Sequence, residues 1–388
     1  MDFRPTEDQL ALQESIRRFA AARLDTDLPE RDRAGVFSRK LWEECAALGI
    51  QGLPLPVEYG GQGADVLTTS LAMEALGEAC RDGGLVFSLN AHLWSAAMPL
   101  LEFGSERQKS RWLPGMCDGS IVAVHAITEP AAGSDAMALT TSARKDGAMY
   151  VLDGTKHFIT NAPEADLFIV FATVDRAQGW AGVTAFLVPR DTAGLSVGPG
   201  VDKLGLRTSP TGEVVLRDCR VPDRYLLGAP GAGMMVFEYA MRLERACIMA
   251  SAVGMMRRQL DECLAHTIGR HQFGQPIADF QAVSHTLADM KVRLEAASLL
   301  SRHAAWLADR RELEALDASV TKLHVSEAYV RSSLDALQLH GGHGYMTESG
   351  IDRDLRDAIG SRIYSGTSQM QRDIIAGRLR MPSTASGS

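Results

Sequence analysis

Residues 362–369 read Arg-Ile-Tyr-Ser-Gly-Thr-Ser-Gln, and this short stretch decides how the rest of the chain is interpreted. It has to be read together with Leu243-Glu244-Arg245, far upstream in the sequence. The hydroxyl of Ser365 cannot accept a proton from carbon at neutral pH, whereas a partly buried carboxylate such as that of Glu244 can. Whether the chain is an enzyme therefore depends on Glu244.

The size and composition indicate a globular protein built from several subdomains. The chain has 388 residues, of which 46% are apolar and 23% are charged, and both fractions are ordinary for soluble proteins. A chain of this length buries a large core, so we expect two or three packed subdomains. The net charge is −8 and the basic residues are dispersed, which argues against nucleic-acid binding and against attachment to anionic membranes.

No segment predicts a membrane span or an export signal. The most apolar run, 84–103, is interrupted by Asn90, His92 and Glu102, so we do not expect it to reach membrane-spanning length. The first residues lack the basic-then-apolar layout of a secretory signal, and a cytoplasmic location is expected. The six cysteines include no CxxC pair, which predicts reduced, buried thiols and no metal site: Cys45, Cys80, Cys117, Cys219, Cys247 and Cys263.

Residues 1–120 predict an all-helical domain. Capping-box patterns start helices at Thr6 and at Ser105. An Ala/Leu-rich run at 66–80 predicts a further helix. The run 84–103 is apolar nearly all round and should form a central helix.

Residues 121–230 predict a middle β-domain. Val, Ile, Phe and Thr become prominent in short segments, and Asp146-Gly147 and Asp153-Gly154 are turn signals at hairpin spacing. We expect an antiparallel sheet or small barrel made of the segments 121–128, 148–153, 156–161, 167–174, 183–189 and 212–221.

Helical periodicity returns from residue 231 onward, in much longer elements. Their length is typical of a helical bundle. The expected helices are 231–269, 278–308, 316–340, 351–358 and 366–378. The fold class is therefore α+β, with an N-terminal all-α domain (1–120), a middle antiparallel β-domain (121–230), a C-terminal four-helix bundle (231–381) and a flexible tail (382–388).

This order of domains and seven motifs resemble the acyl-CoA dehydrogenase family over residues 5–380. Any one motif is weak evidence, but seven in the family's order make chance agreement negligible. The motifs are Ala126-Ile127-Thr128-Glu129-Pro130 continuing to Gly133-Ser134-Asp135, Lys156-His157-Phe158-Ile159-Thr160-Asn161, Lys203-Leu204-Gly205-Leu206-Arg207, Asp218-Cys219-Arg220-Val221-Pro222, Arg270-x-Gln272-Phe273-Gly274, Gln338-x-x-Gly341-Gly342 and Gly366-Thr367-Ser368.

The resemblance implies FAD as the cofactor and assigns residues to it. Those expected beside the flavin ring and the thioester are Ile127, Thr128, Gly133 and Ser134, with Phe158 and Thr160 covering the other side of the ring. Those expected to reach the FAD of a neighbouring subunit are Arg270, Gln272, Phe273, Gln281, Gln338, Gly341 and Gly342, while Thr367 and Gln369 would contact the bound cofactor. Many relatives carry Trp at the position of Phe158. A forked arginine suits a diphosphate and glycine permits close backbone approach, yet taken singly Arg270 is also an ordinary surface charge and Gly341-Gly342 an ordinary helix cap.

The family reaction is the α,β-dehydrogenation of an acyl thioester, in which a carboxylate removes the α proton and the β hydrogen leaves as hydride. The family's usual glutamate position holds Ser365 here, whose backbone N–H would still polarise the thioester carbonyl. Glu244 stands in the pattern where the isovaleryl-CoA dehydrogenase branch keeps its base, so we expect Glu244 to be the base. Arg245 would tune the site or contact the substrate's phosphopantetheine arm. The alternative is that Glu244 merely pairs with a nearby arginine.

Helical spacing suggests the surroundings of this carboxylate. Met241 and Ile248 would share its side of the helix and partly desolvate it. Ser251 and Ala252 would be small enough to let a ligand approach the helix. Because Ser365 is also small, a bulky or cyclic acyl group next to the carbonyl would fit.

A closer similarity is to flavin dehydrogenases that oxidise L-prolyl groups on peptidyl carrier proteins in natural-product biosynthesis. It rests on Gly84-Leu85-Val86-Phe87, Ala97-Met98-Pro99, Asn161-Ala162-Pro163, Glu244-Arg245-Ala246-Cys247, Gly254-Met255-Met256 and Ser365-Gly366-Thr367-Ser368. The expected function is thus FAD-dependent dehydrogenation of a short or cyclic acyl thioester, of the prolyl or extender-unit type, held on an acyl- or peptidyl-carrier protein.

Other functions and partners remain open at this stage. One alternative is a short- or branched-chain acyl-CoA dehydrogenase acting on CoA thioesters. Another is a non-catalytic flavin-binding partner protein, and a minor one is a flavin oxidase or N-oxygenase. The family shares FAD across a subunit boundary, which implies a homo-oligomer, expected to be a tetramer.

Overall fold

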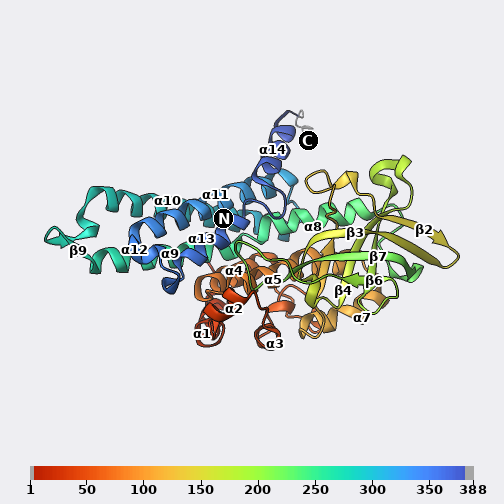
Figure 1. The fold of residues 1–388 in the computed structure, drawn as a ribbon, viewed down its shortest axis with the longest axis horizontal. Coiled ribbons are helices and arrows are strands. Elements are labelled where there is room, and N and C mark those ends of the chain that lie inside the picture. Colours follow the sequence, from red (N-terminus) through yellow and green to blue (C-terminus); the bar gives the residue numbers. More distant parts are fainter. Residues whose placement is uncertain (1–3, 381–388) are drawn as a thin grey trace.

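The computed structural model describes residues 4–380, which form three consecutive regions (Figure 1). Within these residues a helical region is followed by an eight-stranded sheet and then by a bundle of long helices. The order of helices, sheet and helices predicted from the sequence is therefore confirmed. The tail expected to be flexible, 382–388, lies outside the described residues.

Side-chain caps start several helices of the N-terminal region, which are α1 (Glu7–Arg23), α2 (Leu28–Ala34), α3 (Arg39–Ala47), α4 (Val66–Ala79), α5 (Gly83–His92), α6 (Met98–Phe103) and α7 (Glu106–Cys117). Thr6 and Gln9 form a reciprocal capping box at the start of α1, and Ser105 and Gln108 form another at the start of α7. Each pair satisfies two backbone N–H groups that have no partner inside the helix. Both predicted capping boxes are therefore confirmed.

The apolar run 84–103 forms a nearly continuous helical column through the core. Helix α5 passes through a π-helical turn, Leu93–Ala97, into α6, and such turns are frequent at functional sites. By length and composition Gly83–Phe103 could cross a membrane, so the expectation that no run reaches that length is wrong. However, 83% of its most apolar window is buried inside the protein. It is the central helix that its all-round apolar character predicts.

The middle region folds into one sheet, made of β1 (Ala123–Ala126), β2 (Ser142–Asp146), β3 (Met149–Thr160), β4 (Leu167–Thr173), β5 (Val183–Pro189), β6 (Leu195–Val197), β7 (Thr211–Pro222) and β8 (Leu226–Leu227). The strand order is β6-β7-β3-β2-β4-β5-β8, and β1 pairs with β4 off this path. The pairing is antiparallel as expected, except that β1 and β2 each pair with β4 in parallel.

The two strands expected at 148–153 and 156–161 are a single strand, β3. We read Asp153-Gly154 as a turn signal, but this glycine lies inside the strand. A Cβ atom at Gly154 would lie 2.3 Å from the hydroxyl oxygen of Thr141. The glycine is therefore required by the close approach of two segments, which is a common role for glycine within a strand.

A buried ion pair joins β3 to the segment that follows β1. Lys156 Nζ lies 2.8 Å from Glu129 Oε1, and both side chains are buried. Thr140 and Thr141 also donate to this carboxylate, each through its backbone N–H and its hydroxyl. Burial opposes ionisation of Glu129, but Lys156 and the hydroxyls outweigh it and lower its pKa to about 2. Lys156 also donates to the carbonyl of Ile127 at 3.2 Å, so the pair fixes that segment in place.

The C-terminal region consists of α8 (Gly233–Cys247), α9 (Ala250–Gly269), the small hairpin β9 (His271–Gln272) and β10 (Gln275–Pro276), α10 (Gln281–Asp309), α11 (Ala315–His340), α12 (Gly342–Tyr345), α13 (Ile351–Gly360) and α14 (Ser368–Arg380). The helix expected over 231–269 is in fact two helices, α8 and α9. The chain leaves regular α-helical hydrogen bonding at Ile248 and Met249. Glu244 therefore lies in the last turn of a shorter helix.

Helix α9 packs backbone to backbone against α4. A Cβ atom at Gly77 would lie 2.0 Å from the carbonyl oxygen of Ser251, and one at Gly254 would lie 1.9 Å from the carbonyl oxygen of Glu74. No side chain fits between these two helices at either point. The close approach directly after the break sets the direction in which α9 leaves α8.

Buried charges tie the three regions together. Arg258 of α9 pairs with Asp354 of α13 at 2.9 Å and donates to the carbonyl of Cys80 at 2.9 Å. The carboxylate of Asp82, which precedes α5, accepts a hydrogen bond from the hydroxyl of Thr208 in the middle region. The six cysteines, all within residues 4–380, are buried as predicted and are unpaired.

Replacing Lys156 by Met should lower the free energy of unfolding by about 3–5 kcal/mol, because it leaves the carboxylate of Glu129 buried without its counter-ion. Urea unfolding followed by circular dichroism measures the loss. The double variant Lys156→Met/Glu129→Gln should lose less than Lys156→Met alone.

The matched control is Lys291→Met, which removes an exposed lysine that pairs with Glu295 at 2.6 Å on the surface of α10. We expect a change within about 0.5 kcal/mol there, because exposed pairs contribute little. Equal effects of the two lysine substitutions would show that the buried pair is not a structural anchor.

Candidate active site

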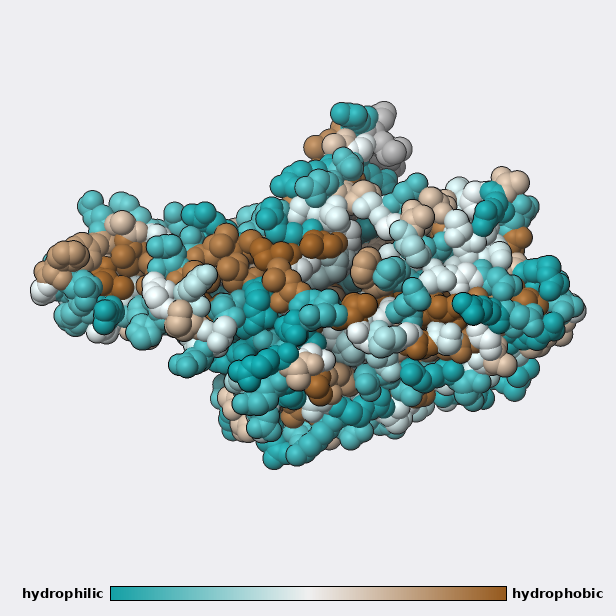
Figure 2. All heavy atoms as spheres, viewed as in Figure 1, coloured by the Kyte–Doolittle hydropathy of each residue, from teal (hydrophilic) through white to brown (hydrophobic). Residues whose placement is uncertain are grey.

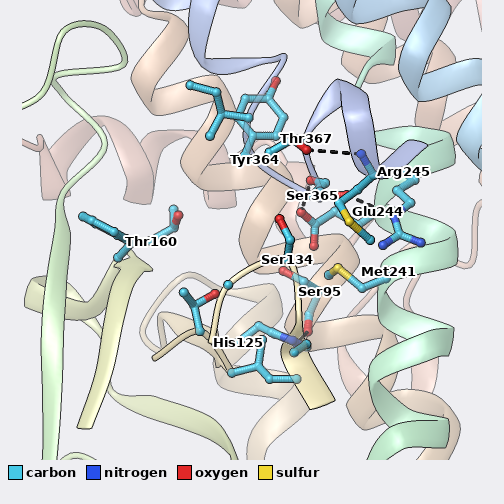
Figure 3. A pocket seen from close by; sticks show the side chains of 18 of the residues that line it. Ser95, His125, Ser134, Thr160, Met241, Glu244, Arg245, Tyr364, Ser365 and Thr367 are labelled. Atoms are coloured by element: carbon cyan, nitrogen blue, oxygen red, sulfur yellow. Dashed lines mark hydrogen bonds between the residues drawn. The ribbon is translucent and has the colours of Figure 1, made fainter. Parts of the chain in front are cut away.

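A large cavity lies where the three regions meet. Its volume is about 1040 Å³, slightly above the roughly 300–1,000 Å³ of ordinary ligand sites. The wall combines α5 and its π turn, β1 and the loop after it, β3, α8 and the connection between α13 and α14. Figure 3 shows side chains from these elements around a common space.

Glu244 reaches this cavity from α8 and is the most buried acid of its wall. The residue is only 8% exposed, and its Oε1 accepts a hydrogen bond from the hydroxyl of Ser365 (Figure 3). Within residues 4–380 no ion pair of 4 Å or less involves Glu244. Arg245, its neighbour in sequence, instead donates through Nε to the carbonyl of Ser365 at 3.0 Å. The alternative that Glu244 merely pairs with an arginine therefore does not describe its contacts.

Burial and the neighbouring groups act in opposite directions on the carboxyl group of Glu244. Burial raises the pKa of Glu244 above its ordinary value. The hydrogen bond from Ser365 and the charges of Arg245 and Lys322 act against that rise. A carboxylate with a raised pKa is a stronger base than an exposed one, which suits proton abstraction.

Ser365 and Gly366 form a turn with left-handed backbone. Their φ angles are +56° and +92°, values that glycine adopts freely and serine rarely. Three side chains hold the turn through its carbonyls. Arg245 and Gln371 donate to the carbonyl of Ser365 at 3.0 and 3.1 Å, while Lys322 and Gln371 donate to that of Gly366 at 2.7 and 2.9 Å. Because a trans peptide directs its N–H opposite to its C=O, the N–H groups that follow these carbonyls face away from the three donors.

Lys322 supplies one of these donors from α11 although its side chain is buried. Burial and the neighbouring charge of Arg245 lower the pKa of Lys322 to about 7, and Glu244 and Glu327 only partly offset this. The ammonium group therefore loses part of its charge near neutral pH. A lysine held at this balance beside an acid is typical of functional sites, although structural networks produce the same effect.

Phe158 forms an exposed apolar wall of the cavity at an irregular point in β3. The pairing register with β7 shifts between Lys156 and Ile159, and Phe158 has a φ of +56°. The side chain is 64% exposed and stacks on His157 with ring centroids 4.1 Å apart. A strained backbone that turns an aromatic ring outward is more often found at ligand sites than in an ordinary sheet core.

The structure brings together one group of the residues expected at the site. The members of this group all line the cavity: Ile127, Thr128, Gly133, Ser134, Phe158, Thr160, Glu244, Arg245, Ser365 and Thr367. They come from segments more than a hundred residues apart in the sequence. Their convergence is the main structural support for the site.

The second group of expected residues lies elsewhere, at and near the β9 end of the bundle (Figure 1). These residues are exposed and do not line the cavity: Arg270, Gln272, Phe273, Gln281, Gln338, Gly341 and Gly342. The ends of α9 and α11 adjoin there, since the rings of His266 and His340 lie 4.3 Å apart. Phe273 is 94% exposed, which suits a residue that contacts another molecule.

The structure differs from the expected site in three details. Ser251 and Ala252 do not share the cavity side of Glu244, because the helix breaks after Cys247 and both residues belong to α9 and are buried there. Gln369 is exposed on α14 and does not line the cavity. Only Met241, of the helical neighbours that we proposed for Glu244, lines the cavity with it.

Several residues at the site were missed by the sequence reasoning. Ser95 on the π turn is 4% exposed and lines the cavity, and the backbone carbonyl of Ser95 lies 3.2 Å from His125 Nδ1. Lys322 was hidden in an ordinary helical pattern. Tyr364, whose ring lies tilted against that of Phe87 with centroids 4.5 Å apart, belongs to the stretch 362–369 but was not singled out. A serine inside a strongly apolar run was the one signal that could have marked Ser95.

The cavity suits a flat aromatic cofactor together with a substrate. Phe158 offers an apolar face, and at Gly133 an added Cβ would meet no atom within 4 Å, so protein packing does not explain this glycine. A ligand lying close to the backbone would explain it. Arg242, Arg245 and Arg378 add cations to the wall, and these suit phosphate groups.

Three protein-family models match the chain in sequence. The model "Acyl-CoA dehydrogenase, N-terminal domain" matches residues 6–120, the model of the middle domain matches residues 125–219, and the model of the C-terminal domain matches residues 231–380. Together the three models cover most of the chain in the order that the motifs predicted.

Similar proteins match over nearly their whole length. An L-prolyl-[peptidyl-carrier protein] dehydrogenase of Pseudomonas fluorescens is 44% identical over 383 residues, which covers 98% of this chain and 100% of the relative. The crystal structure of the prolyl acyl carrier protein oxidase AnaB has a TM-score of 0.96 at 43% identity and covers 97% of this chain and 100% of its own. A structure of PigA with FAD and proline has a TM-score of 0.95 at 40% identity, with 98% and 99% covered.

Replacing Lys322 by Met should loosen the Ser365-Gly366 turn, because the carbonyl of Gly366 loses its lysine donor. Hydrogen–deuterium exchange of the backbone amides at 365–367 should become faster. The overall stability should stay the same or rise, because the substitution removes a buried cation.

Lys291→Met is again the control, since Lys291 is exposed on α10 and distant in sequence from the turn. In Lys291→Met, hydrogen–deuterium exchange of the backbone amides at 365–367 should match the wild type. Unchanged exchange in Lys322→Met would mean that Arg245 and Gln371 alone hold the turn.

Proposed function

Since this chain belongs to the acyl-CoA dehydrogenase family, we propose that it oxidises a short or cyclic acyl group held as a thioester on a carrier protein, with Glu244 as the base. The protein is an FAD-dependent oxidoreductase that dehydrogenates acyl thioesters at a CH–CH bond, as its relatives do.

One observation carries the choice of Glu244 as the base. Among the acidic residues that line the cavity within residues 4–380, Glu244 is the only buried one, since Asp135, Glu238, Glu314 and Asp373 are exposed. Burial raises the pKa of Glu244, so its carboxylate accepts a proton from a weak carbon acid more readily than an exposed one does. Ser365 at the family's usual position has no such capacity.

In the proposed reaction the α carbon of the acyl group loses its proton to the carboxylate of Glu244. FAD, when bound, would supply the two-electron oxidant for the β hydrogen, so that loss of both hydrogens would leave a double bond between the α and β carbons. The N–H of Ser365 donates to the thioester oxygen and stabilises the charge that develops there. Ile127, Thr128, Phe158 and Thr160 hold the flavin ring and keep water from it.

The acyl group is proposed to be prolyl or a similar small cyclic or branched unit. Ser365 takes little space beside Glu244, so the cavity accommodates bulk close to the α carbon. Two similar proteins are named for prolyl groups on carrier proteins. Arg242, Arg245 and Arg378 on the cavity wall suit the phosphate of a phosphopantetheine arm. We place the enzyme in the cytoplasm, in natural-product biosynthesis.

The enzyme is proposed to work as a homotetramer that completes each FAD site with a second subunit. Seven of the expected cofactor residues lie exposed near the β9 end, where a second subunit could reach them: Arg270, Gln272, Phe273, Gln281, Gln338, Gly341 and Gly342. Figure 2 shows apolar surface running along the helical bundle, and its exposed apolar side chains include Ile268, Phe273, Val292, Leu299 and Leu334. Exposed apolar surface on this scale is typical of protein–protein contacts. Thr367 and Gln369 would contact the cofactor where the subunits meet.

Replacing Glu244 by Gln should lower turnover about 10²- to 10⁴-fold, because glutamine cannot accept the α proton. FAD content should stay at the wild-type level. Single-turnover bleaching of the flavin measures the rate, and a non-catalytic flavin-binding protein would show no difference between the two forms. Glu295→Gln, which changes an exposed carboxylate on α10, is the matched control and should keep full activity.

Incubating the flavoprotein with prolyl- and butyryl-loaded carrier proteins should show mass losses on the carrier by mass spectrometry. The proposal expects the prolyl-loaded carrier to lose the mass of two or four hydrogens. Because each oxidation removes two hydrogens, the loss also gives the number of oxidation steps. Matched CoA thioesters test the acyl-CoA dehydrogenase alternative, since equal or better turnover of CoA substrates would overturn the carrier-protein proposal. Fast reoxidation of the reduced flavin by oxygen would instead favour an oxidase.

A further inference from the structure

The proposed function leaves open which groups orient the carboxylate of Glu244 and keep it ionised. The contacts of Glu244 bear on both points. Resting on that proposed function, we propose that the hydroxyl of Ser365 is a positioning group for Glu244. The serine thus serves the reaction through its side chain and not only through its backbone N–H.

The hydroxyl of Ser365 points at the base from a fixed backbone. Its Oγ donates to Glu244 Oε1, and the residue holds a φ of +56°, which serine rarely adopts. Arg245 and Gln371 hold its carbonyl at 3.0 and 3.1 Å, so the turn has little freedom to swing away. A hydroxyl anchored in this way fixes the orientation of the carboxylate, which otherwise rotates about several side-chain bonds.

Ser95 approaches the same carboxylate from a different element. It lies on the π turn of the central helix and is 4% exposed, and its hydroxyl donates to the carbonyl of Ala91 at 2.5 Å. Figure 3 shows Ser95 and Ser365 on two sides of Glu244. Because the one hydroxyl proton of Ser95 goes to Ala91, Ser365 is the serine whose hydroxyl donates to Glu244.

The arrangement answers an energetic need of this site. Burial alone pushes Glu244 toward its neutral form, which cannot accept a proton. Hydrogen bonds to the charged form of a carboxylate favour that form, and bonds to charged groups are stronger than those between neutral groups. The hydroxyl of Ser365 favours the ionised form of a buried base without placing a full counter-charge against it, so the carboxylate stays basic.

Charged and titratable groups from the packed elements also face Glu244 and must stay constant in the test. They are Arg245 on its own helix, Lys322 on α11 and Tyr364 before the turn. Lys322 titrates near pH 7, so its effect falls on the neutral-to-alkaline side of the rate profile. The acid limb reports Glu244, since the base must be ionised to act.

Ser365→Ala should lower kcat about tenfold and move the acid limb of the kcat profile upward by about one pH unit, because one hydrogen bond to the charged carboxylate is lost. KM and FAD content should change little. Ser365→Gly should behave in the same way. Glycine fits the positive φ without strain, so a loss shared by both variants belongs to the hydroxyl and not to the backbone.

The control is Ser333→Ala on α11, a buried serine whose hydroxyl bonds to the carbonyl of Tyr329 at 2.9 Å, away from the cavity. It should keep the wild-type rate and acid limb.

The outcomes separate this inference from the proposed function. If Glu244→Gln is as active as the wild type, Glu244 is not the base and the proposed function fails first. If Glu244→Gln is inactive while both Ser365 variants keep the wild-type kcat and acid limb, the proposed function stands and the positioning role of Ser365 is wrong. A fall in kcat without any shift of the acid limb would also overturn it, since a general structural defect would produce that result.

Discussion

The burial of the Glu244 carboxyl group without a directly paired cation is the constraint on which the rest of this structure depends. A buried acid in a cavity tends to become neutral, and a directly paired cation would make it a weak base. The contacts around Glu244 avoid both outcomes. The hydroxyl of Ser365 donates to the carboxylate, while Arg245 and Lys322 donate to the carbonyls of the adjacent turn. The charges of Arg245 and Lys322 therefore act on Glu244 without forming an ion pair with it.

The three regions of the fold each contribute a part that the others cannot supply. The N-terminal helices provide the π turn with Ser95, the sheet provides the Ile127 segment and the ring of Phe158, and the bundle provides Glu244 and the Ser365-Gly366 turn. The buried pair of Lys156 and Glu129 fixes the sheet's contribution, since Lys156 also holds the carbonyl of Ile127. The site is therefore a product of how the regions pack and not of any one of them.

Much of the fold could be predicted from the sequence because its signals are local. Capping boxes at Thr6 and Ser105, β-rich segments and long helical periods all depend on residues close together in the chain. The errors arose where distant contacts decide the outcome. Gly154 looked like a turn residue, but its role is to admit Thr141. The expected helix 231–269 breaks because α9 must lie against α4, and no pattern within that stretch records the position of α4.

The candidate site shows the same division. Ser365 could be singled out because it stands where the family motif usually has a glutamate. Glu244 could be singled out because it stands where another branch of the family carries its base. The places of Ser95 and His125 in the cavity wall and the contact of Lys322 with the turn could not, since each depends on three-dimensional neighbours.

Close contact of α4 and α9 at Gly77 and Gly254 has a wider consequence. A single added methyl group at either glycine would push the two helices apart and tilt the start of α9. The orientation of the last turn of α8 would change as a result. Two residues that touch neither ligand nor base thus govern how well the catalyst is aligned, and a genetic screen would find them as sensitive as the active site itself.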